Sequence, residues 1–442
     1  MAEDNPTFEG RDAVAPVTKA ARVESLDILR GIAVFGILAM NITAFGLLFQ
    51  AYGNPTVAGG AEGPNLLAFK IINVGFEGTM RGIFSLLFGA GIVLLTERME
   101  QAGAGIMAAE VHFRRMLWMM LFGVIHWTLL LWTGEILFAY SLCGLVLFSF
   151  RKLAPRRLLI IAGALLLVAT VMSFGGAKSL AETKATATAA LTAKAAGTKL
   201  TAEQEQAIEG WERELSHWTP TPENAAEQKA WHSGSYLDAV SGQLPGSFEF
   251  QWIGLPFFFF FDMVPFMLIG MALLKLGVLG AQRSMQFYLG MVVAGYGIGL
   301  PLGFYEMNLI VGSGFDIVAA RQADTTYEIS RLAMVIGHLG LLLAFIKSGL
   351  FKAFQRGMAA VGTMALSNYL MQTIVCTWLF YSFGPGLGLW GQLERHELYY
   401  VVGAIWVAEF IWSVIWLKYF RFGPFEWLWR SLTYWQRQPM KL

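Results

Sequence analysis

The sequence predicts an all-α polytopic membrane protein of about ten transmembrane helices, with a helical insert on the outer (periplasmic) face. Hydrophobic residues make up 56% of the 442 positions and charged residues only 14%, against about 25% charged in an ordinary soluble protein. Apolar runs of about 20 residues, the length that a hydrocarbon core of about 30 Å requires, recur along the chain. The formal net charge of +1 gives no global field that would attract nucleic acid.

The elements follow in order from the amino terminus. Residues 1–21 are polar and contain Pro6 and Pro16, which predicts a disordered cytoplasmic tail. The apolar run that follows is too long for the core of a signal peptide, so we interpret it as a retained first span. Spans are predicted at residues 31–49, 76–95, 113–132, 135–150, 157–174, 254–274, 285–310, 332–350, 358–383 and 399–416.

Lysine and arginine support this count. If the amino terminus is cytoplasmic, both termini and the basic loops face the same side, as the positive-inside rule expects. The turn at Thr133 and Gly134 is the weakest boundary, and a buried break is its alternative. The predicted cytoplasmic tails are residues 1–21 and 421–442. Between them we expect an N-terminal bundle of spans 1 to 5 (22–174), an extracytoplasmic cap (175–250) and a C-terminal bundle of spans 6 to 10 (251–420).

The insert over residues 175–250 is predicted to be a small helical cap. Its first part is rich in Ala, Thr, Lys and Glu, and a Thr-Pro-Thr-Pro sequence separates it from a second helical piece. Two interpretations stay open. The cap is either a solvated hairpin with no role in binding, or it roofs an outward-facing cavity through Trp231, His232, Tyr236 and Asp238.

His126 is an ionisable residue in an otherwise apolar run, where an unpaired polar group is expensive. At 1.5 Å per helical residue it lies roughly 20 Å from the inner face. Groups on other spans fall at a similar outer depth, which favours a shared polar cavity; the alternatives are ion pairs that merely hold helices together and a hydrogen-bonded core histidine. The groups are Glu135, Asp262, and a predicted cavity ion pair of Glu77 and Arg81 with His338.

The inner mouths of the spans are basic. The default explanation is the positive-inside bias, and the alternative is a docking patch for a phosphorylated cytosolic donor, because arginine binds phosphate bidentately. No Walker or dinucleotide motif is present, and the two cysteines show no metal-ligand spacing, so no metal is expected. The arginines concerned are Arg30, Arg114, Arg115, Arg151 and Arg157.

Several stretches resemble the YeiB-like bacterial inner-membrane family, whose carboxy-terminal part is a domain of unknown function. They are residues 22–42 (RVESLDILRGIAVFGILAMNI), 80–91 (MRGIFSLLFGAG), His126 with 132–140 (WTGEILFAY), 362–372 (GTMALSNYLMQ) and 423–430 (GPFEWLWR). The resemblance covers nearly the whole chain, in the family's order. It implies the fold of the transmembrane acyltransferases, whose relatives modify envelope sugars or acetylate heparan glucosamine in lysosomes, and a bacterial inner-membrane location.

In those relatives an acyl group from cytosolic acyl-CoA reaches an acceptor on the far side near an intramembrane histidine, and His126 is the matching position. The resemblance therefore implies acyl-CoA as co-substrate, and membrane lipid and an unidentified extracytoplasmic acceptor as partners. The family's usual Gly-Asp-Ile-Leu is changed here to Gly-Glu, which gives Glu135. The basic residues of the inner mouths would hold the phosphates of the acyl-CoA.

Acyl transfer needs a base or a nucleophile, and a histidine oriented by a carboxylate can act as either. Glu135 or Asp262 is the expected orienter, and side-chain amides are the expected donors to the oxyanion or to the acceptor. A transporter or exporter of a small or lipid-like substrate is the alternative, because charged intramembrane cavities also mark substrate paths. Aromatic late spans also allow a homodimer. The amides are those of Asn41, Asn368 and Gln372.

Overall fold

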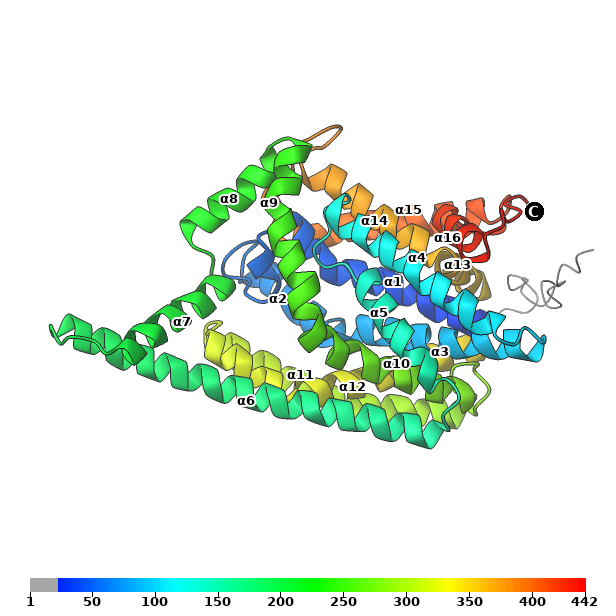
Figure 1. Cartoon of the computed structure of the whole chain (residues 1–442), viewed down its shortest axis with the longest axis horizontal. Coiled ribbons are helices and arrows are strands. Elements are labelled where there is room, and N and C mark those ends of the chain that lie inside the picture. The colour runs from blue at the N-terminus through cyan, green and yellow to red at the C-terminus, as the bar shows by residue number, and fades with distance from the viewer. Residues whose placement is uncertain (1–22) are drawn as a thin grey trace, which may run out of the picture.

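The computed structural model describes residues 23–442, and over this range the chain is an all-α polytopic membrane protein (Figure 1). Within that range the single β contact is an isolated antiparallel bridge between Phe420 and Lys441. The tail predicted over residues 1–21, and Arg22, lie outside the described residues.

The amino-terminal part supplies helices that pack closely through glycine. A Cβ atom on Gly89 of α3 would strike the backbone of Met267, and one on Gly270 of α10 would strike the backbone of Leu86. Small residues let membrane helices approach in this way. The helices of this part are α1 (Glu24–Gly46), α2 (Gly63–Gly75), α3 (Thr79–Gln101), α4 (Met107–Thr128) and α5 (Leu137–Leu147), with the 3-10 turns η2 (Phe49–Tyr52) and η3 (Phe148–Phe150).

Helix α6 (Pro155–Ala195) begins with proline, which suits a first helical turn. It continues for roughly 60 Å without a break, so the boundary predicted between residues 174 and 175 falls inside one helix. The rest of the cap is α7 (Ala202–Trp218), α8 (Pro222–Ser233) and α9 (Tyr236–Glu249). In Figure 1, α6 runs along the bottom, and the hairpin it forms with α7 extends beyond the bundle.

The carboxy-terminal part departs from the predicted spans at two places. Helix α12 begins at Ile317, well before the predicted start at residue 332, because the Asp316 side chain caps it by accepting from the Val318 and Ala319 N–H groups. The span predicted over residues 358–383 is two helices, which meet at Met364. The elements are the π-helical η4 (Phe250–Phe259), α10 (Phe260–Lys275), α11 (Met285–Gly312), α12 (Ile317–Ser348), α13 (Lys352–Thr363), α14 (Ala365–Phe380), α15 (Arg395–Trp416) and α16 (Pro424–Tyr434).

Six helical stretches in the described part are long and apolar enough to cross a membrane by length and composition. Each of the ten predicted spans overlaps a helix, but α4 is not among the six and α5, α10 and the pair α13 and α14 are short, so the count of ten stays a prediction. The six stretches are Glu24–Gly46, Gly63–Gln101, Pro155–Ala195, Met285–Gly312, Ile317–Ser348 and Arg395–Trp416.

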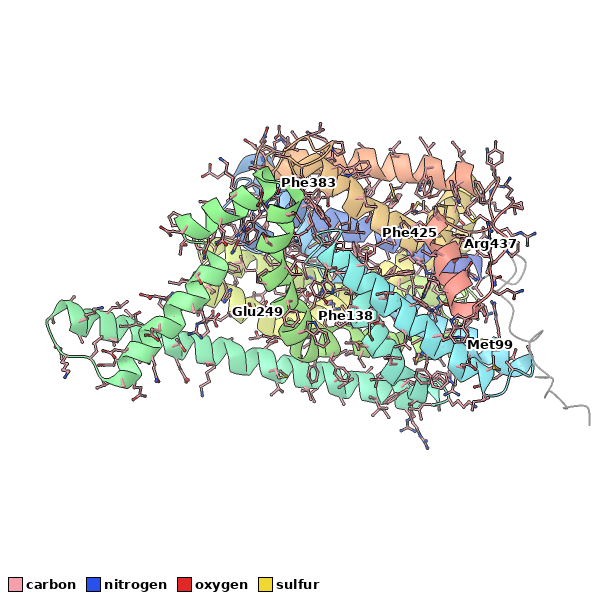
Figure 2. All side chains as sticks on the ribbon, turned by 45° about the horizontal axis from the view of Figure 1, so that its top comes forward. Met99, Phe138, Glu249, Phe383, Phe425 and Arg437 are labelled. Atoms are coloured by element: carbon pink, nitrogen blue, oxygen red, sulfur yellow. The ribbon has the colours of Figure 1, made fainter. Side chains whose placement is uncertain are left out.

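Two ends of the bundle serve as landmarks below. The cap end carries α8 and α9, and the tail end carries α16 and the carboxyl terminus (Figure 1). Figure 2 places Met99 and Arg437 at the tail end and Phe383 toward the cap end. The main apolar core lies between these ends and draws on α1, α3, α5 and α10.

Candidate functional site

A cavity of about 240 Å³ opens at the tail end, between α1, α3, α4, α14 and α16. Its mouth is basic, and Asp27 offsets one of the arginines through an ion pair with Arg30 at 2.6 Å. Its inner part is apolar and aromatic, so the lining changes from cationic to apolar along the length of the cavity. The four mouth arginines are Arg30, Arg98, Arg115 and Arg430, and the inner lining includes Met119, Leu137, Tyr140 and Tyr369.

Helix α16 forms one wall of the mouth. The Trp429 ring lies 4.1 Å from the guanidinium carbon of Arg115, and its indole N–H donates to the Arg115 carbonyl at 3.0 Å. Glu426 anchors the same helix to the start of α14, because its carboxylate accepts from the Leu366 N–H at 2.7 Å and the Ser367 N–H at 3.0 Å. The carboxy-terminal segment is therefore part of the cavity.

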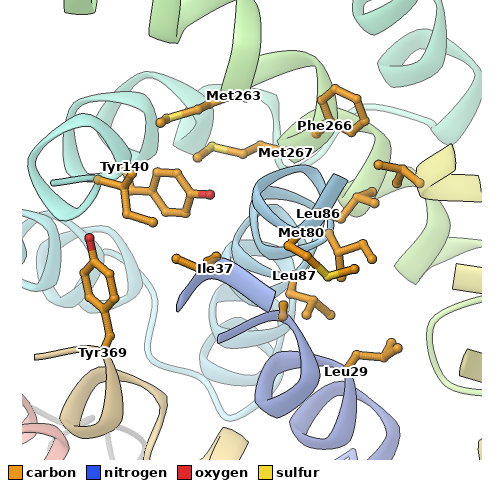
Figure 3. Close-up of a cluster of buried hydrophobic side chains, with 14 of the residues drawn as sticks. Leu29, Ile37, Met80, Leu86, Leu87, Tyr140, Met263, Phe266, Met267 and Tyr369 are labelled. Atoms are coloured by element: carbon orange, nitrogen blue, oxygen red, sulfur yellow. The ribbon is translucent and has the colours of Figure 1, made fainter. Parts of the chain in front are cut away.

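The inner end of the cavity lies between two tyrosines. Figure 3 shows the Tyr369 ring pointing from α14 toward the side of the cluster that carries Tyr140. The Tyr140 hydroxyl is 2.8 Å from the Ser85 hydroxyl, and both residues are buried. The other face of Tyr369 meets the His126 imidazole edge-on, with 5.0 Å between ring centroids. One aromatic ring thus separates the cavity from the histidine.

His126 is fully buried in the last turn of α4 and lies between a hydroxyl and a carboxylate. Its Nε2 atom is 2.8 Å from Thr373 Oγ1 on α14, and its Nδ1 atom is 3.6 Å from Glu135 Oε1. The histidine therefore does meet a carboxylate, and that carboxylate is Glu135.

Glu135 occupies the loop over residues 129–136, just before α5. Its carboxylate accepts from the backbone N–H groups of Leu137 and Phe138, the latter at 2.9 Å, which fixes it at the start of the helix. Gly123 makes this possible, because a Cβ atom there would strike the Phe138 backbone. The two elements that carry the histidine and the carboxylate are therefore held in direct contact.

The same loop is covered by the cap. The Tyr236 hydroxyl donates to the Leu129 carbonyl at 2.8 Å, and the Gln243 amide donates to the Leu131 carbonyl at 3.0 Å. Gln251 donates to the Glu135 carbonyl at 3.0 Å. Thr133 and Gly134 of the predicted turn are half-buried, and the cap holds the segment that carries Glu135.

Three polar atoms at this place are buried and lack a hydrogen-bond partner among the described residues. They are His126 Nδ1, Tyr369 OH and Trp132 Nε1. Buried polar groups are normally satisfied, so a cluster of unsatisfied ones marks a strained, wet or ligand-binding place. The arrangement can hold a proton at Nδ1, accept one at Nε2 and offer two donors to an anion.

The structure does not bring Asp262 to His126. Asp262 binds Arg81 through two hydrogen bonds of 2.8 and 2.9 Å, and its other close partner is Arg331 of α12. Glu77 lies in the turn before α3, where it accepts from the Tyr327 hydroxyl at 2.6 Å and is 3.9 Å from Arg81. The expected Glu77 and Arg81 ion pair is therefore present at 3.9 Å, but the hydrogen bonds of the Arg81 guanidinium go to Asp262, which Arg331 shares.

His338 does not join that ion pair. It lies in the second half of α12, where its Nδ1 atom is 2.9 Å from the Met334 carbonyl oxygen and its ring packs on Tyr296. The predicted depth was wrong because α12 extends to Ile317, so the cap end of this helix is much farther away than a start at residue 332 implied.

None of the three amides predicted as donors makes a hydrogen bond to His126 among the described residues. Asn368 donates to the Val361 carbonyl and to Ser413, and accepts from the Trp412 indole at 2.8 Å. Gln372 donates to Glu409 at 2.9 Å, so both residues tie α14 to its neighbours. Asn41 is half-buried on α1 and makes no side-chain hydrogen bond within residues 23–442.

Two of the five predicted mouth arginines line the cavity, Arg30 and Arg115. Arg114 pairs with Glu110 at 3.0 Å, and Arg151 pairs with Glu100 at 3.0 Å. Arg157 is exposed in the first turn of α6. These three belong to the tail-end surface and not to the cavity lining.

Known proteins resemble this chain over almost its whole length. The Escherichia coli K12 uncharacterized protein YeiB is 30% identical over 414 residues, which covers 92% of this chain and 95% of YeiB. The chain belongs to the YeiB family. The Bacillus subtilis 168 uncharacterized protein YxaH is 29% identical over 446 residues, and the match covers 97% of this chain and 98% of YxaH. Residues 273–436 match the family described as protein of unknown function (DUF418), and no solved structure matches.

The predicted site of this YeiB-family chain missed residues whose neighbours only the fold reveals. From the sequence alone, Thr373, Tyr369 and Trp132 are ordinary members of apolar stretches. A helix-face analysis of α14 gives the direction of Thr373 and Tyr369 but not their partner, and Trp132 lies in a loop. Arg98 could have been added from the basic pattern alone, because it lies near a predicted inner span end, whereas Arg430 lies in the predicted carboxy-terminal tail and only the fold brings it to the cavity. No cluster of three or more metal-ligating side chains occurs among the described residues.

Proposed function

We propose that this chain is a transmembrane acyltransferase that takes a short acyl group, such as acetyl, from acyl-CoA and passes it to an extracytoplasmic or membrane-embedded acceptor. The observation that carries the proposal is the cavity, which begins among arginines and ends at Tyr369, one ring from His126. An anionic head on a thin, less polar arm is the kind of ligand that matches this gradient.

The mouth suits the head of such a donor. Arginine guanidinium groups bind phosphate oxygens bidentately and remain charged, and the cavity lining supplies four of them against two carboxylates, Asp27 and the Glu426 that accepts from the start of α14. The stacking of Arg115 on Trp429 orients one guanidinium while leaving its polar edge able to bond. The nucleotide would remain at the mouth, because the cavity of about 240 Å³ holds only an arm and a short acyl chain.

The inner end suits the chemistry. A thioester that reaches Tyr369 lies beside an imidazole whose Nδ1 faces the carboxylate of Glu135, and that carboxylate favours the tautomer with the proton on Nδ1. Nε2 is then unprotonated and acts as general base for an attacking hydroxyl or amine. Asp262 takes no part in this step.

The location that fits this function is the bacterial inner membrane with both termini cytoplasmic. The tail end would then face the cytosolic pool of acyl-CoA, and the cap would face the extracytoplasmic side. The gathering of basic residues at the tail end supports this orientation.

Calorimetry on the purified chain in nanodiscs tests donor binding. We expect CoA to bind, and the double variant Arg30→Gln with Arg115→Gln to weaken binding about tenfold or more, because each arginine contributes a charge-assisted contact. Arg157→Gln is the matched control, since this exposed arginine lies outside the cavity. Equal binding by the native and double-variant chains would remove the cavity from the proposal.

Transfer is tested with radiolabelled acetyl-CoA and extracts of membrane lipid and envelope sugar as acceptors. Label is expected in an extracted product with native protein and not with His126→Ala. Absence of CoA binding together with full biological function of His126→Ala would contradict the acyltransferase and favour the transporter alternative.

A further inference from the structure

Thr373 differs from the other threonines in helices. Many of them turn the hydroxyl back onto their own helix and donate to the carbonyl four residues earlier, as helical threonines commonly do. Thr373 instead points its hydroxyl at His126 Nε2, 2.8 Å away. The threonines bonded to their own helix are Thr96, Thr128, Thr170, Thr183, Thr188, Thr192 and Thr433.

Three side chains from three elements form a line. Glu135 is fixed by backbone N–H groups and faces Nδ1 of His126, and Nε2 of the same ring faces Thr373. A hydroxyl within reach of a base that a third group orients is the signature of an activated nucleophile. All three side chains are buried, and the order of hydroxyl, imidazole and carboxylate is that of a catalytic triad.

We propose that Thr373 is the nucleophile that carries the acyl group between donor and acceptor, so that the transferase acts by a double displacement. This inference rests on the proposed acyl transfer and adds to it a covalent intermediate. It changes the role of His126, which becomes a proton carrier for two successive steps and is never itself acylated.

The first step forms an ester. His126 Nε2 takes the proton of the Thr373 hydroxyl as Oγ1 attacks the thioester carbonyl carbon. The carbon–sulfur bond then breaks, and the CoA sulfur leaves with the proton from Nε2. The second step reverses these roles: an acceptor hydroxyl or amine gives its proton to Nε2, bonds to the acyl carbon, and Oγ1 leaves with that proton. The net change is acyl-CoA plus acceptor to acylated acceptor plus CoA thiol.

The unsatisfied donors at the site fit the charge that both steps develop. The Tyr369 hydroxyl and the Trp132 indole N–H are buried without a partner among the described residues. Either can donate to the oxyanion of a tetrahedral intermediate, for which preorganised donors are a main source of rate. In the resting site the Tyr369 hydroxyl lies close to the Trp132 side chain and the Ile136 backbone, so both donors face the same small space.

Tyr369 also explains how a buried threonine is reached. It lies four residues before Thr373 on α14, so the two side chains are neighbours one turn apart. Its ring lines the cavity on one side and contacts His126 on the other. Rotation of this one side chain would bring the inner end of the cavity to the hydroxyl.

Isotope exchange without acceptor tests the intermediate. A double displacement lets native protein exchange radiolabelled CoA into acetyl-CoA in the absence of any acceptor, and peptide mass spectrometry should find an acetyl ester on Thr373. Thr373→Val, which keeps the shape and lacks the hydroxyl, should lose exchange and reduce transfer by roughly 10³-fold or more. Thr373→Ser should keep both.

Thr377→Val is the matched control, because the Thr377 hydroxyl, one turn farther along α14, donates to the Leu130 carbonyl at 3.4 Å. Its exchange should equal that of native protein. Transfer that needs acceptor, shows no exchange and survives in Thr373→Val would overturn the covalent role while leaving the acyltransferase intact. Native protein that neither binds CoA nor transfers acetyl would remove both.

Discussion

Two groups of polar side chains within the described bundle differ in how fully they are bonded. In the Arg81 network (Arg81, Asp262 and Arg331), both Asp262 oxygens accept from guanidinium groups, and all three Arg331 nitrogens are bonded. Beside it, Glu328 Oε2 lies 3.8 Å from Arg331 and has no hydrogen-bond partner among the described residues. In the His126 site (His126, Glu135, Thr373, Tyr369 and Trp132), three buried polar atoms lack partners.

This difference in bonding distinguishes a structural role, joining helices, from a chemical role. A charge pair that satisfies itself joins helices and leaves nothing for a ligand, whereas a site with unused donors and an unprotonated ring nitrogen can bind and transfer. The sequence offered both groups at one depth and could not rank them. Bond saturation, which only the fold reveals, favours the His126 site as the chemical centre.

The sharpest test of the comparison is His126→Gln. We expect acetyl transfer to fall by about 10² to 10⁴-fold, because the general base is lost. Thermal stability in detergent should change little, because glutamine can still bond to Thr373. His338→Gln is the control, since that imidazole bonds to the backbone of Met334 and Gly75, away from the His126 site. Loss of folded protein in His126→Gln would place this histidine with the structural group.

Asp262→Asn tests the other side of the comparison. It removes the negative charge between the buried Arg331 and the half-buried Arg81, and we expect a loss of about 3 to 5 kcal/mol in unfolding free energy. The loss of stability is measured by heating the protein and determining, by size-exclusion chromatography, the fraction that stays monodisperse. Asp324→Asn, in an exposed pair with Arg321, should cost less than about 1 kcal/mol. A stable Asp262→Asn variant that fails to transfer would move Asp262 into the reacting group.

A third histidine extends the comparison to the cap. His232 of α8 is stacked between Tyr381 and Trp390, with centroids 4.3 and 4.4 Å away, and this burial lowers the pKa of His232 to about 4. The unfolded ring takes a proton near pH 6.5, whereas the docked ring stays neutral until about pH 4. Docking of the cap should therefore weaken as the pH falls from 6.5 to 4, by up to about 1.4 kcal/mol per pH unit.

Hydrogen exchange of α8, corrected for the intrinsic rate at each pH, measures that docking. His232→Phe keeps a ring in the stack and removes the titration, so its protection should not depend on pH in this range. The same pH dependence in both proteins would assign the effect to another group.

The smallest effect is expected at the cavity mouth. Trp429→Leu removes the ring on which Arg115 stacks, and such a contact is worth about 0.5 to 2 kcal/mol. CoA binding should weaken by a few-fold, with no change in thermal stability beyond that of Trp427→Leu, whose indole bonds to the Gln438 carbonyl outside the cavity lining. Unchanged CoA affinity would separate α16 from the binding site.

Much of the fold follows from the sequence, because apolar length and basic loops respond directly to a bilayer. The pairing of His126 with Glu135 was also predictable, since a short loop joins their helices. Thr373 and Arg331 were not, because each meets its partner across a sequence distance of 247 or 69 residues, which no local pattern encodes. The depth of His338 was misjudged because Asp316, the N-cap of α12, starts that helix earlier than predicted.

The uninterrupted length of α6 gives the molecule a mechanical property. A helix of roughly 60 Å is about twice as long as the hydrocarbon core is thick, so half of it stands outside the bilayer. Lys184 braces this outer part against Asp316 at 2.8 Å. A tilt of about 10° at the membrane surface would displace the far tip of this outer part by about 5 Å, so a small change in the angle of α6 is magnified at its hairpin with α7.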